Sequence, residues 1–242
     1  MNKADKFKLL YIFGISLIFY FMGCVDTSVQ NLPSTVDYHS QIQLINLATV
    51  SGTATIDVVN YDGSIDANTQ LSVGSAYPAD TQPFMDIPSG TKTFKVTFSN
   101  ASFNVDLTKT IDSERKIRLI LINPDANSVD LIKSDQRYTW QEKNSKNAGD
   151  LFPADTAQIS FFNASPDVTV NTIEVSDSTI ETTLGVGNAF SYKKFPAANY
   201  TITFKDTADL ATTTINAQST NKYTAVLYGT QGNLQAKVYT DD

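Results

Sequence analysis

The chain has 242 residues, with 18 Lys and Arg against 25 Asp and Glu, a formal net charge of −7, one histidine and one cysteine. An acidic chain without a basic run is not expected to bind nucleic acid or anionic lipid surfaces. With one histidine and one cysteine the chain lacks the ligand sets of zinc centres and the usual nucleophile–histidine pairs, so we predict no metal, no cofactor and no enzymatic activity.

The N-terminus has the parts of a bacterial lipoprotein signal peptide. Three lysines lie within residues 1–8, an apolar run covers residues 9–22, and Gly23-Cys24 closes it. At about 1.5 Å per residue the run spans roughly 21 Å, less than the ~30 Å hydrocarbon core, which argues against an uncleaved transmembrane anchor. An ordinary secretory signal is the other alternative. The small residue before Cys24 resembles a lipobox, which predicts removal of residues 1–23 and lipidation of the Cys24 thiol, with palmitate among the acyl chains.

Residues 24–40 are predicted to be a polar tether between this lipid and the fold. Val25, rather than an aspartate, directly follows the cysteine. Under proteobacterial sorting rules this favours the outer membrane, facing either the periplasm or the cell exterior. Two acyl chains hold a protein stably, since each buried CH₂ contributes about 0.8 kcal/mol. The membrane is therefore the first predicted partner.

Two segments of the remaining chain repeat each other. At a constant offset of 117 the identical pairs are Gln41/Gln158, Ile42/Ile159, Asn46/Asn163, Thr55/Thr172, Ile56/Ile173 and Val58/Val175. The similarity continues through Leu71-x-Val-Gly74 against Leu184-x-Val-Gly187. We infer a duplicated unit, with repeat one at residues 41–133, a linker at 134–156 and repeat two at 157–242.

Each unit has the pattern of an antiparallel β-sandwich. Phe94, Val96 and Phe98 alternate with polar residues, and so do Tyr200, Ile202 and Phe204 in the second unit. Period-two alternation places the apolar groups on one face of a strand. Turn residues such as Asp62-Gly63, Pro88-Ser89-Gly90 and Gly232-Asn233 recur along the chain, and the spacing of strands fits antiparallel β-sandwiches. The predicted fold class is all-β, with two tandem antiparallel β-sandwiches.

The second unit resembles a known family. Asn163-Ala-Ser-Pro-Asp167 precedes a Val-rich strand, and Phe195-Pro-Ala197 precedes the Tyr200–Phe204 strand. This series resembles DUF4397, a family of unknown function with tandem Ig-like repeats in secreted and lipidated bacterial proteins. In the first unit Asn46-Leu-Ala-Thr-Val50 replaces the opening motif. The resemblance implies an all-β envelope protein whose two tandem sandwiches are Ig-like, and it implies no reaction.

Several polar residues could be catalytic or metal-binding, but each can also be explained by a role in stabilising the fold. His39 precedes the first predicted strand, so we assign it no catalytic role. Asp62, Asp125, Asp167 and Asp206 lie in predicted turns, where an aspartate commonly bonds its own backbone. A calcium site at residues 125–130 is the alternative there, although the EF-hand glycine and glutamate are missing. Asn46 and Asn163 are predicted to be buried amides that satisfy turn backbone.

Four residues are candidates for binding or modification. Tyr138 and Trp140 lie in the linker, where they could stack on a sugar, dock a protein or cover the junction between the sandwiches. Thr156 and Thr207 lie in Asp-Thr-Ala tripeptides that resemble bacterial O-glycosylation sites. The leading functional hypothesis is a structural, adhesion or binding module with a protein or glycan partner at the envelope. The alternative is a polysaccharide-binding or weakly hydrolytic envelope protein.

Overall fold

The computed structural model describes residues 38–79, 84–100, 104–125, 128–135 and 155–241. Strands and turns make up this part of the chain, and no helix occurs in it, so the protein is all-β as predicted. Accordingly, within the described ranges there is no helix with the length and apolar character needed to cross a membrane. The predicted signal run and Cys24 lie outside the described residues.

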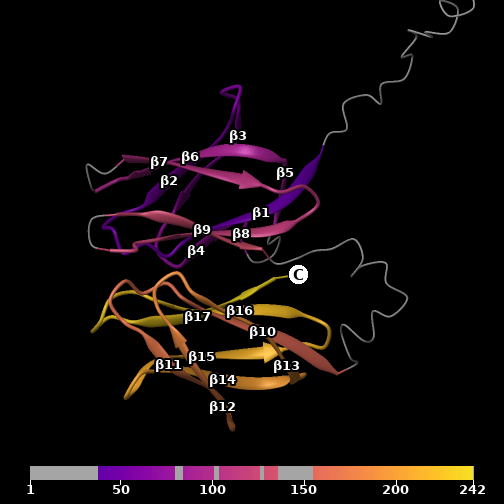
Figure 1. Cartoon of the computed structure of the whole chain (residues 1–242), viewed down its shortest axis with the longest axis vertical. Coiled ribbons are helices and arrows are strands. Elements are labelled where there is room, and N and C mark those ends of the chain that lie inside the picture. The colour runs from indigo at the N-terminus through magenta and orange to yellow at the C-terminus, as the bar shows by residue number, and fades with distance from the viewer. Residues whose placement is uncertain (1–37, 80–83, 101–103, 126–127, 136–154, 242) are drawn as a thin grey trace, which may run out of the picture. The chain divides into compact units, whose positions relative to one another are not determined.

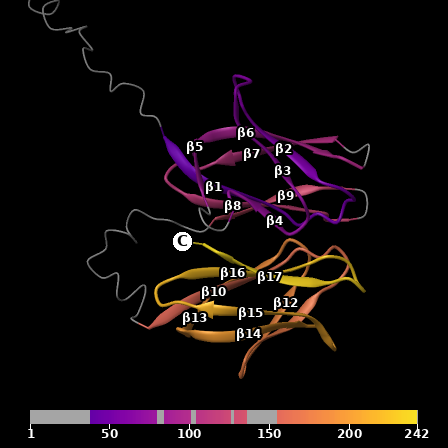
Figure 2. The same cartoon turned by 180° about the vertical axis from the view of Figure 1, so that it is seen from behind.

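The first repeat forms two sheets (Figures 1 and 2). The first sheet has the order β4-β1-β8-β9, with β5 also paired to β1, and the second has the order β3-β2-β6-β7. The strands are β1 His39–Asn46, β2 Ala54–Asn60, β3 Ile65–Leu71, β4 Ser75–Tyr77, β5 Met85–Pro88, β6 Gly90–Phe98, β7 Asn104–Ile111, β8 Lys116–Ile122 and β9 Asp130–Asp135.

The second repeat has the same plan, with sheets β13-β10-β16-β17 and β12-β11-β14-β15. Its strands are β10 Thr156–Asn163, β11 Val170–Val175, β12 Ser178–Leu184, β13 Ala189–Pro196, β14 Ala198–Lys205, β15 Asp209–Ala217, β16 Lys222–Tyr228 and β17 Gln235–Thr240. A single strand, β13, stands where the first repeat has β4 and β5. The shared strand order supports the duplication inferred from the sequence.

One pair of strands in each sandwich is parallel. β1 runs parallel to β8 and β10 runs parallel to β16, while the other pairs are antiparallel. The predicted β-sandwich architecture is confirmed, and each sandwich is mixed rather than wholly antiparallel. Because parallel neighbours end at the same edge of a sheet, the loops after β1 and β8 leave the first sandwich side by side. The loops after β10 and β16 do the same in the second.

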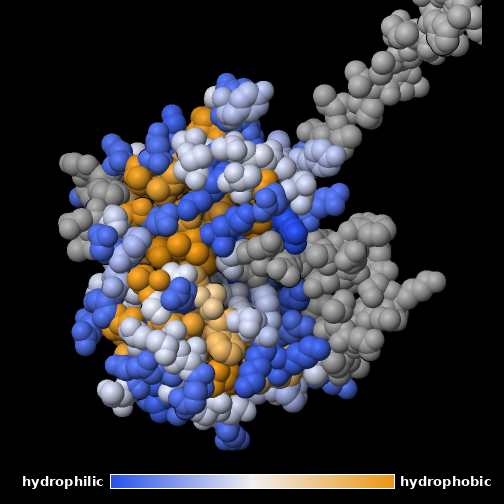
Figure 3. All heavy atoms as spheres, viewed as in Figure 1, coloured by the Kyte–Doolittle hydropathy of each residue, from blue (hydrophilic) through white to orange (hydrophobic). Residues whose placement is uncertain are grey.

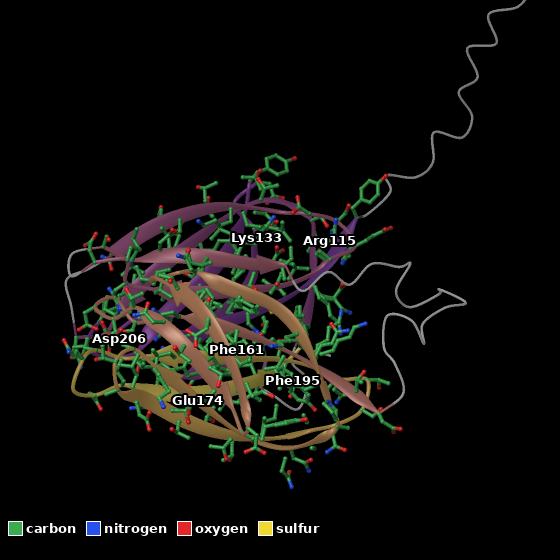
Figure 4. The ribbon with its side chains drawn as sticks, turned by 60° about the horizontal axis from the view of Figure 1, so that its bottom comes forward. Arg115, Lys133, Phe161, Glu174, Phe195 and Asp206 are labelled. Carbon is green, nitrogen blue, oxygen red and sulfur yellow. The ribbon has the colours of Figure 1, made fainter. Side chains whose placement is uncertain are left out.

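A separate apolar core lies between the two sheets of each sandwich. The burial of β6 alternates as predicted, with Phe94, Val96 and Phe98 inside. In the second core, the Phe161 ring meets the Phe204 ring edge-on with centroids 6.4 Å apart. Figure 4 labels Phe161 on β10 and Phe195 on β13, which belong to this core. Polar residues cover much of the face drawn in Figure 3, with apolar patches between them.

A third apolar cluster joins the two repeats through the outer faces of β1, β8, β10 and β16, with one further residue from β17. It is formed by residues that alternate with those of the cores: Ile45, Leu47, Ile120, Ile122, Phe162, Ala164, Val226, Tyr228 and Tyr239. We call it the junction. These four strands are therefore buried on both faces, which explains their nearly continuous apolar sequences.

Equivalent positions of the two repeats meet across the junction. Gly74 of the first repeat has φ +79° and packs against Tyr228 of the second, so closely that a Cβ added to it would lie 2.9 Å from the tyrosine hydroxyl. Gly187 of the second repeat has φ +74°, and a Cβ added to it would lie 3.3 Å from the Ile122 side chain of the first. The two glycines match in the sequence repeat, and Ile122 and Tyr228 both end strands that correspond. The junction is thus an internal, nearly two-fold interface, in which equivalent strands of the two repeats face each other.

Candidate functional site

A hollow of about 490 Å³ lies between loops of both repeats. Eight residues line it: Thr49, Val50, Asn123, Pro124, Asp125, Pro166, Asp167 and Thr230. They come from four loops, which follow β1, β8, β10 and β16. The parallel pairing in each sandwich brings two of these loops together, and the junction brings the two pairs together.

Hydrogen bonds between loops hold the walls of the hollow. In the second repeat, both carboxylate oxygens of Asp167 accept from the backbone N–H of Gln231, at 3.1 and 3.0 Å, and one also accepts from Ser165 at 2.9 Å. In the first repeat, the backbone N–H of Thr49 donates to the Asn123 amide oxygen at 2.6 Å. In each sandwich, therefore, one polar side chain connects the two loops that follow the parallel strands: Asn123 connects the loops after β1 and β8, and Asp167 connects those after β10 and β16.

The prediction that turn aspartates bond their own backbone holds at Asp62 and is wrong at Asp167. Asp62 accepts from the backbone N–H of Ser64 at 2.9 Å, and hydrogen bonds from Ser64 hold the pKa of its carboxyl below the usual value. Asp167 instead accepts from the Ser165 hydroxyl in its own turn and from a backbone N–H in the loop after β16, which parallel pairing places beside it. Sequence spacing alone gives no sign of a partner 64 residues away.

The prediction that Asn46 and Asn163 are buried amides serving turn backbone is confirmed. Asn163 donates to the carbonyls of Val168 at 2.8 Å and Leu184 at 2.9 Å, and its oxygen accepts from the N–H of Ser165 at 3.0 Å. Asn46 makes corresponding bonds in the first repeat, to the Leu71 carbonyl and from the N–H of Ala48. These amides fix the loops after β1 and β10, which form half of the hollow.

A buried polar network beside the junction sets how the two halves of the hollow meet. The Arg118 side chain, on β8, is 0 % exposed and pairs with Asp241, which is also 0 % exposed. Its guanidinium further donates to the Gln43 amide oxygen at 2.8 Å and to the Thr240 carbonyl at 2.9 Å. Its central carbon lies 5.4 Å from the centre of the Tyr239 ring. Arg118 thus fastens the first repeat to the end of β17 in the second.

The carboxylate of Asp241 is satisfied from the second repeat as well. Thr224 donates to it at 2.8 Å and the Tyr192 hydroxyl donates at 2.7 Å. Burial, and then the Asp241 carboxylate, raise the pKa of Tyr192 well above its ordinary value, so this hydroxyl stays a neutral donor. Both charges of the pair have partners, which is the condition for a buried ion pair to be tolerated.

The remaining sequence candidates that the structure describes do not line the hollow. Thr207 is exposed in the turn between β14 and β15, next to Asp206, which Figure 4 labels. Thr156 is half-buried at the start of β10. His39 lies at the start of β1, with its Nδ1 2.6 Å from Asp86. Cys24, Tyr138 and Trp140 lie outside the described residues, so their roles stay predictions.

No group of three or more His, Cys, Asp or Glu side chains suited to a metal ion occurs in the described ranges. In the segment proposed as an alternative calcium site, residues 125–130, the carboxylates bond protein donors. Asp130 accepts from Lys109 at 3.0 Å and from the N–H of Leu131 in its own strand, and Asp125 accepts from the Ser128 hydroxyl at 2.7 Å. The hollow itself was not among the sequence predictions, although the proline-bearing loops that follow apolar strands in both repeats are a signal for it.

Comparison with known proteins supports the family resemblance. Residues 157–242 match the model of DUF4397, described as a domain of unknown function. The second repeat is therefore similar to DUF4397 domains, as its sequence motifs predicted. This match covers β10 to β17, including the loops that carry Pro166, Asp167 and Thr230. A search of curated proteins finds no match.

Two solved structures share some similarity with the chain. The Bacillus anthracis TIE protein is 10 % identical with a TM-score of 0.25, over 83 % of this chain and 34 % of that one. The chain thus spans about a third of that structure's length. A putative cell adhesion protein from Bacteroides uniformis ATCC 8492 is 8 % identical with a TM-score of 0.21, over 84 % of this chain and 99 % of that one.

Proposed function

We propose that the protein is a non-enzymatic lipoprotein of the bacterial outer membrane, anchored through Cys24, whose joined sandwiches present the hollow to a protein or glycan partner. The observation that carries this proposal is the origin of the hollow. Its walls come from four loops, two from each repeat, so neither repeat forms it alone. Loops held on a rigid scaffold are the usual place for binding residues.

The lining of the hollow suits recognition rather than catalysis. Asp125 and Asp167 supply negative charge, while Thr49 and Thr230 supply hydroxyls and the two prolines supply flat apolar surface. The Asp167 oxygens already accept hydrogen bonds from a backbone N–H and a serine. A partner that presents hydroxyl or cationic donors beside a small apolar group fits this lining.

The binding half of the proposal is tested by filling the hollow. Thr230→Trp places a large side chain in it, and Thr214→Trp, at an exposed site on β15, is the matched control. Intact lipoprotein is cross-linked in its native membrane and the attached molecules are identified. We expect Thr230→Trp to lose a partner that the wild type and Thr214→Trp retain. Equal capture by all three proteins refutes binding in the hollow.

The anchoring half is tested separately. Cells labelled with radioactive palmitate should incorporate label into the wild-type protein and not into Cys24→Ser, which should leave the membrane fraction. Label that persists in Cys24→Ser refutes the assigned lipidation site. Incorporation is independent of the hollow, so either half can fail alone.

Polysaccharide binding with weak hydrolysis is the second candidate, favoured by two carboxylates on one hollow. Glycosidases use a pair of carboxyl groups on either side of the scissile bond. The hollow offers Asp125 and Asp167, but none of its eight lining residues is an aromatic that could stack on a sugar. A glycan array together with a reducing-sugar assay on wild type and Asp125→Asn tests this candidate. Absence of both binding and sugar release excludes it.

A further inference from the structure

One end of the first sandwich exposes three large apolar side chains. Tyr61 is 96 % exposed, Ile65 is 59 % exposed and Tyr38 is 56 % exposed. Single exposed apolar residues are common on protein surfaces. What distinguishes these three is the end of the sandwich on which they lie.

The topology places all three at the end where the chain enters from its N-terminus. Tyr38 directly precedes β1, and its carbonyl accepts from the N–H of Ser89 at 2.7 Å, in the turn between β5 and β6. The first residues of β6 pair with the last residues of β2, in the register Asn60 to Lys92. The turn from β2 to β3, which carries Tyr61, is therefore at the same end as Tyr38.

The hairpin that carries Tyr61 and Ile65 is built around a buried cation. The Lys92 side chain is 1 % exposed, and its Nζ contacts Asp66 at 2.5 Å and also the Asn60 side chain. Asn60 in turn donates to Asp66 at 2.6 Å and to Ser64 at 2.9 Å. The corresponding turn of the second repeat, between β11 and β12, is Ser176-Asp177 and carries no aromatic residue. The first hairpin thus presents Tyr61 and Ile65 from a turn that the hydrogen bonds of Lys92 and Asn60 hold in place.

The length of chain before Tyr38 limits what this end can meet. Residues 25–37 separate it from Cys24. Fourteen steps of chain reach at most about 50 Å when fully extended, at ~3.5 Å each. A lipid on Cys24 would therefore keep this end of the sandwich close to a bilayer, at high effective concentration. Tyrosine is enriched where protein meets lipid headgroups, because its ring is apolar and its hydroxyl is polar.

We propose that Tyr61, Ile65 and Tyr38 enter the headgroup region of the membrane that holds the lipid anchor, and that this contact orients the protein. The proposal rests on the lipid anchor of the proposed function. The loops after β1 and β8 are at the opposite end of the same strands, so the hollow faces away from the membrane. The exposed Asp62 carboxylate beside Tyr61 limits the depth to the polar interface.

The test places a fluorescent reporter on each end of the lipidated full chain. In a Trp140→Phe background, Tyr61→Trp and Ile65→Trp report from the hairpin, and Gln231→Trp, exposed beside the hollow, is the matched control. Each protein is reconstituted into neutral phosphatidylcholine vesicles with and without dibrominated lipid, which quenches tryptophan on contact. Flotation of the vesicles shows that each chain is anchored.

We expect brominated lipid to quench both hairpin reporters, whose emission should lie at shorter wavelength on vesicles, and to leave Gln231→Trp unchanged. Unquenched hairpin reporters in chains that float overturn the membrane contact while leaving the anchor intact, and would point to a protein or glycan partner for this end. Equal quenching at both ends overturns the orientation. Chains that fail to float refute the anchor itself.

Discussion

Removing one member of the Arg118–Asp241 pair should destabilise the protein more than any surface charge does. Arg118→Met keeps most of the side-chain volume but leaves the Asp241 carboxylate, 0 % exposed, with only the Thr224 and Tyr192 hydroxyls. Breaking a buried pair from one side costs about 3–5 kcal/mol, because the remaining charge has lost both water and its counter-ion. For a domain of this size each kcal/mol lowers the Tm by about 2–4 °C, so the expected fall is roughly 6–20 °C.

The measurement is urea unfolding followed by circular dichroism, with calorimetry for the Tm. Lys205→Met is the control, since Lys205 pairs with Glu174 and Asp209 at the surface, where the loss of a charge has little effect on stability. The double variant Arg118→Met/Asp241→Leu removes both charges and should cost less than either single change. A loss below about 1 kcal/mol for Arg118→Met, equal to that of Lys205→Met, would refute a buried pair across the junction.

Three further predictions concern the loops and the surface. Asn163→Ala leaves the N–H of Ser165 and the carbonyls of Val168 and Leu184 without their hydrogen bonds to the amide. It should lower the free energy of unfolding by about 2–4 kcal/mol in urea titrations; an unchanged midpoint contradicts this. Gly74→Ala strains a positive φ and meets the facing tyrosine hydroxyl at 2.9 Å, so it should cost more in calorimetry than Gly63→Ala, where φ is also positive and the space is open; equal costs refute the close approach. Lys133 holds the pKa of Asp112 below its ordinary 3.8, so this contribution to stability is present above that pH and is lost as the pH falls through the lowered value. Lys133→Gln should raise the Asp112 pKa toward 3.8 in an NMR titration, and no movement would contradict the pairing.

The sequence predicted what local spacing determines. Strand alternation around Phe94 and Tyr200, the turn at Asp62-Gly63 and the buried amides at Asn46 and Asn163 all depend on residues near one another or on the repeat. The offset of 117 then predicted that both units share one fold.

Long-range pairing determines the features that the sequence did not predict. Parallel pairing of β1 with β8 joins residues 75 apart, and it is this pairing that gathers the loops of the hollow. The junction does have a local signal, because the long buried runs of β8 and β16 are typical of strands covered on both faces. β6 and β14 alternate because one face of each is exposed to solvent, so their sequences give no indication of the buried junction between the repeats.

The polar network shows why the two repeats are not interchangeable at their junction. Arg118 on β8 and Thr224 on β16 occupy equivalent positions, since Lys116 and Lys222 begin the two strands in the same parallel register. A junction between two repeats that both carried arginine at this position would bury two cations. A junction between two repeats that both carried threonine would leave Asp241 without a counter-ion. The nearly two-fold junction is therefore specific for one repeat of each kind, and the hollow that depends on it has two different halves.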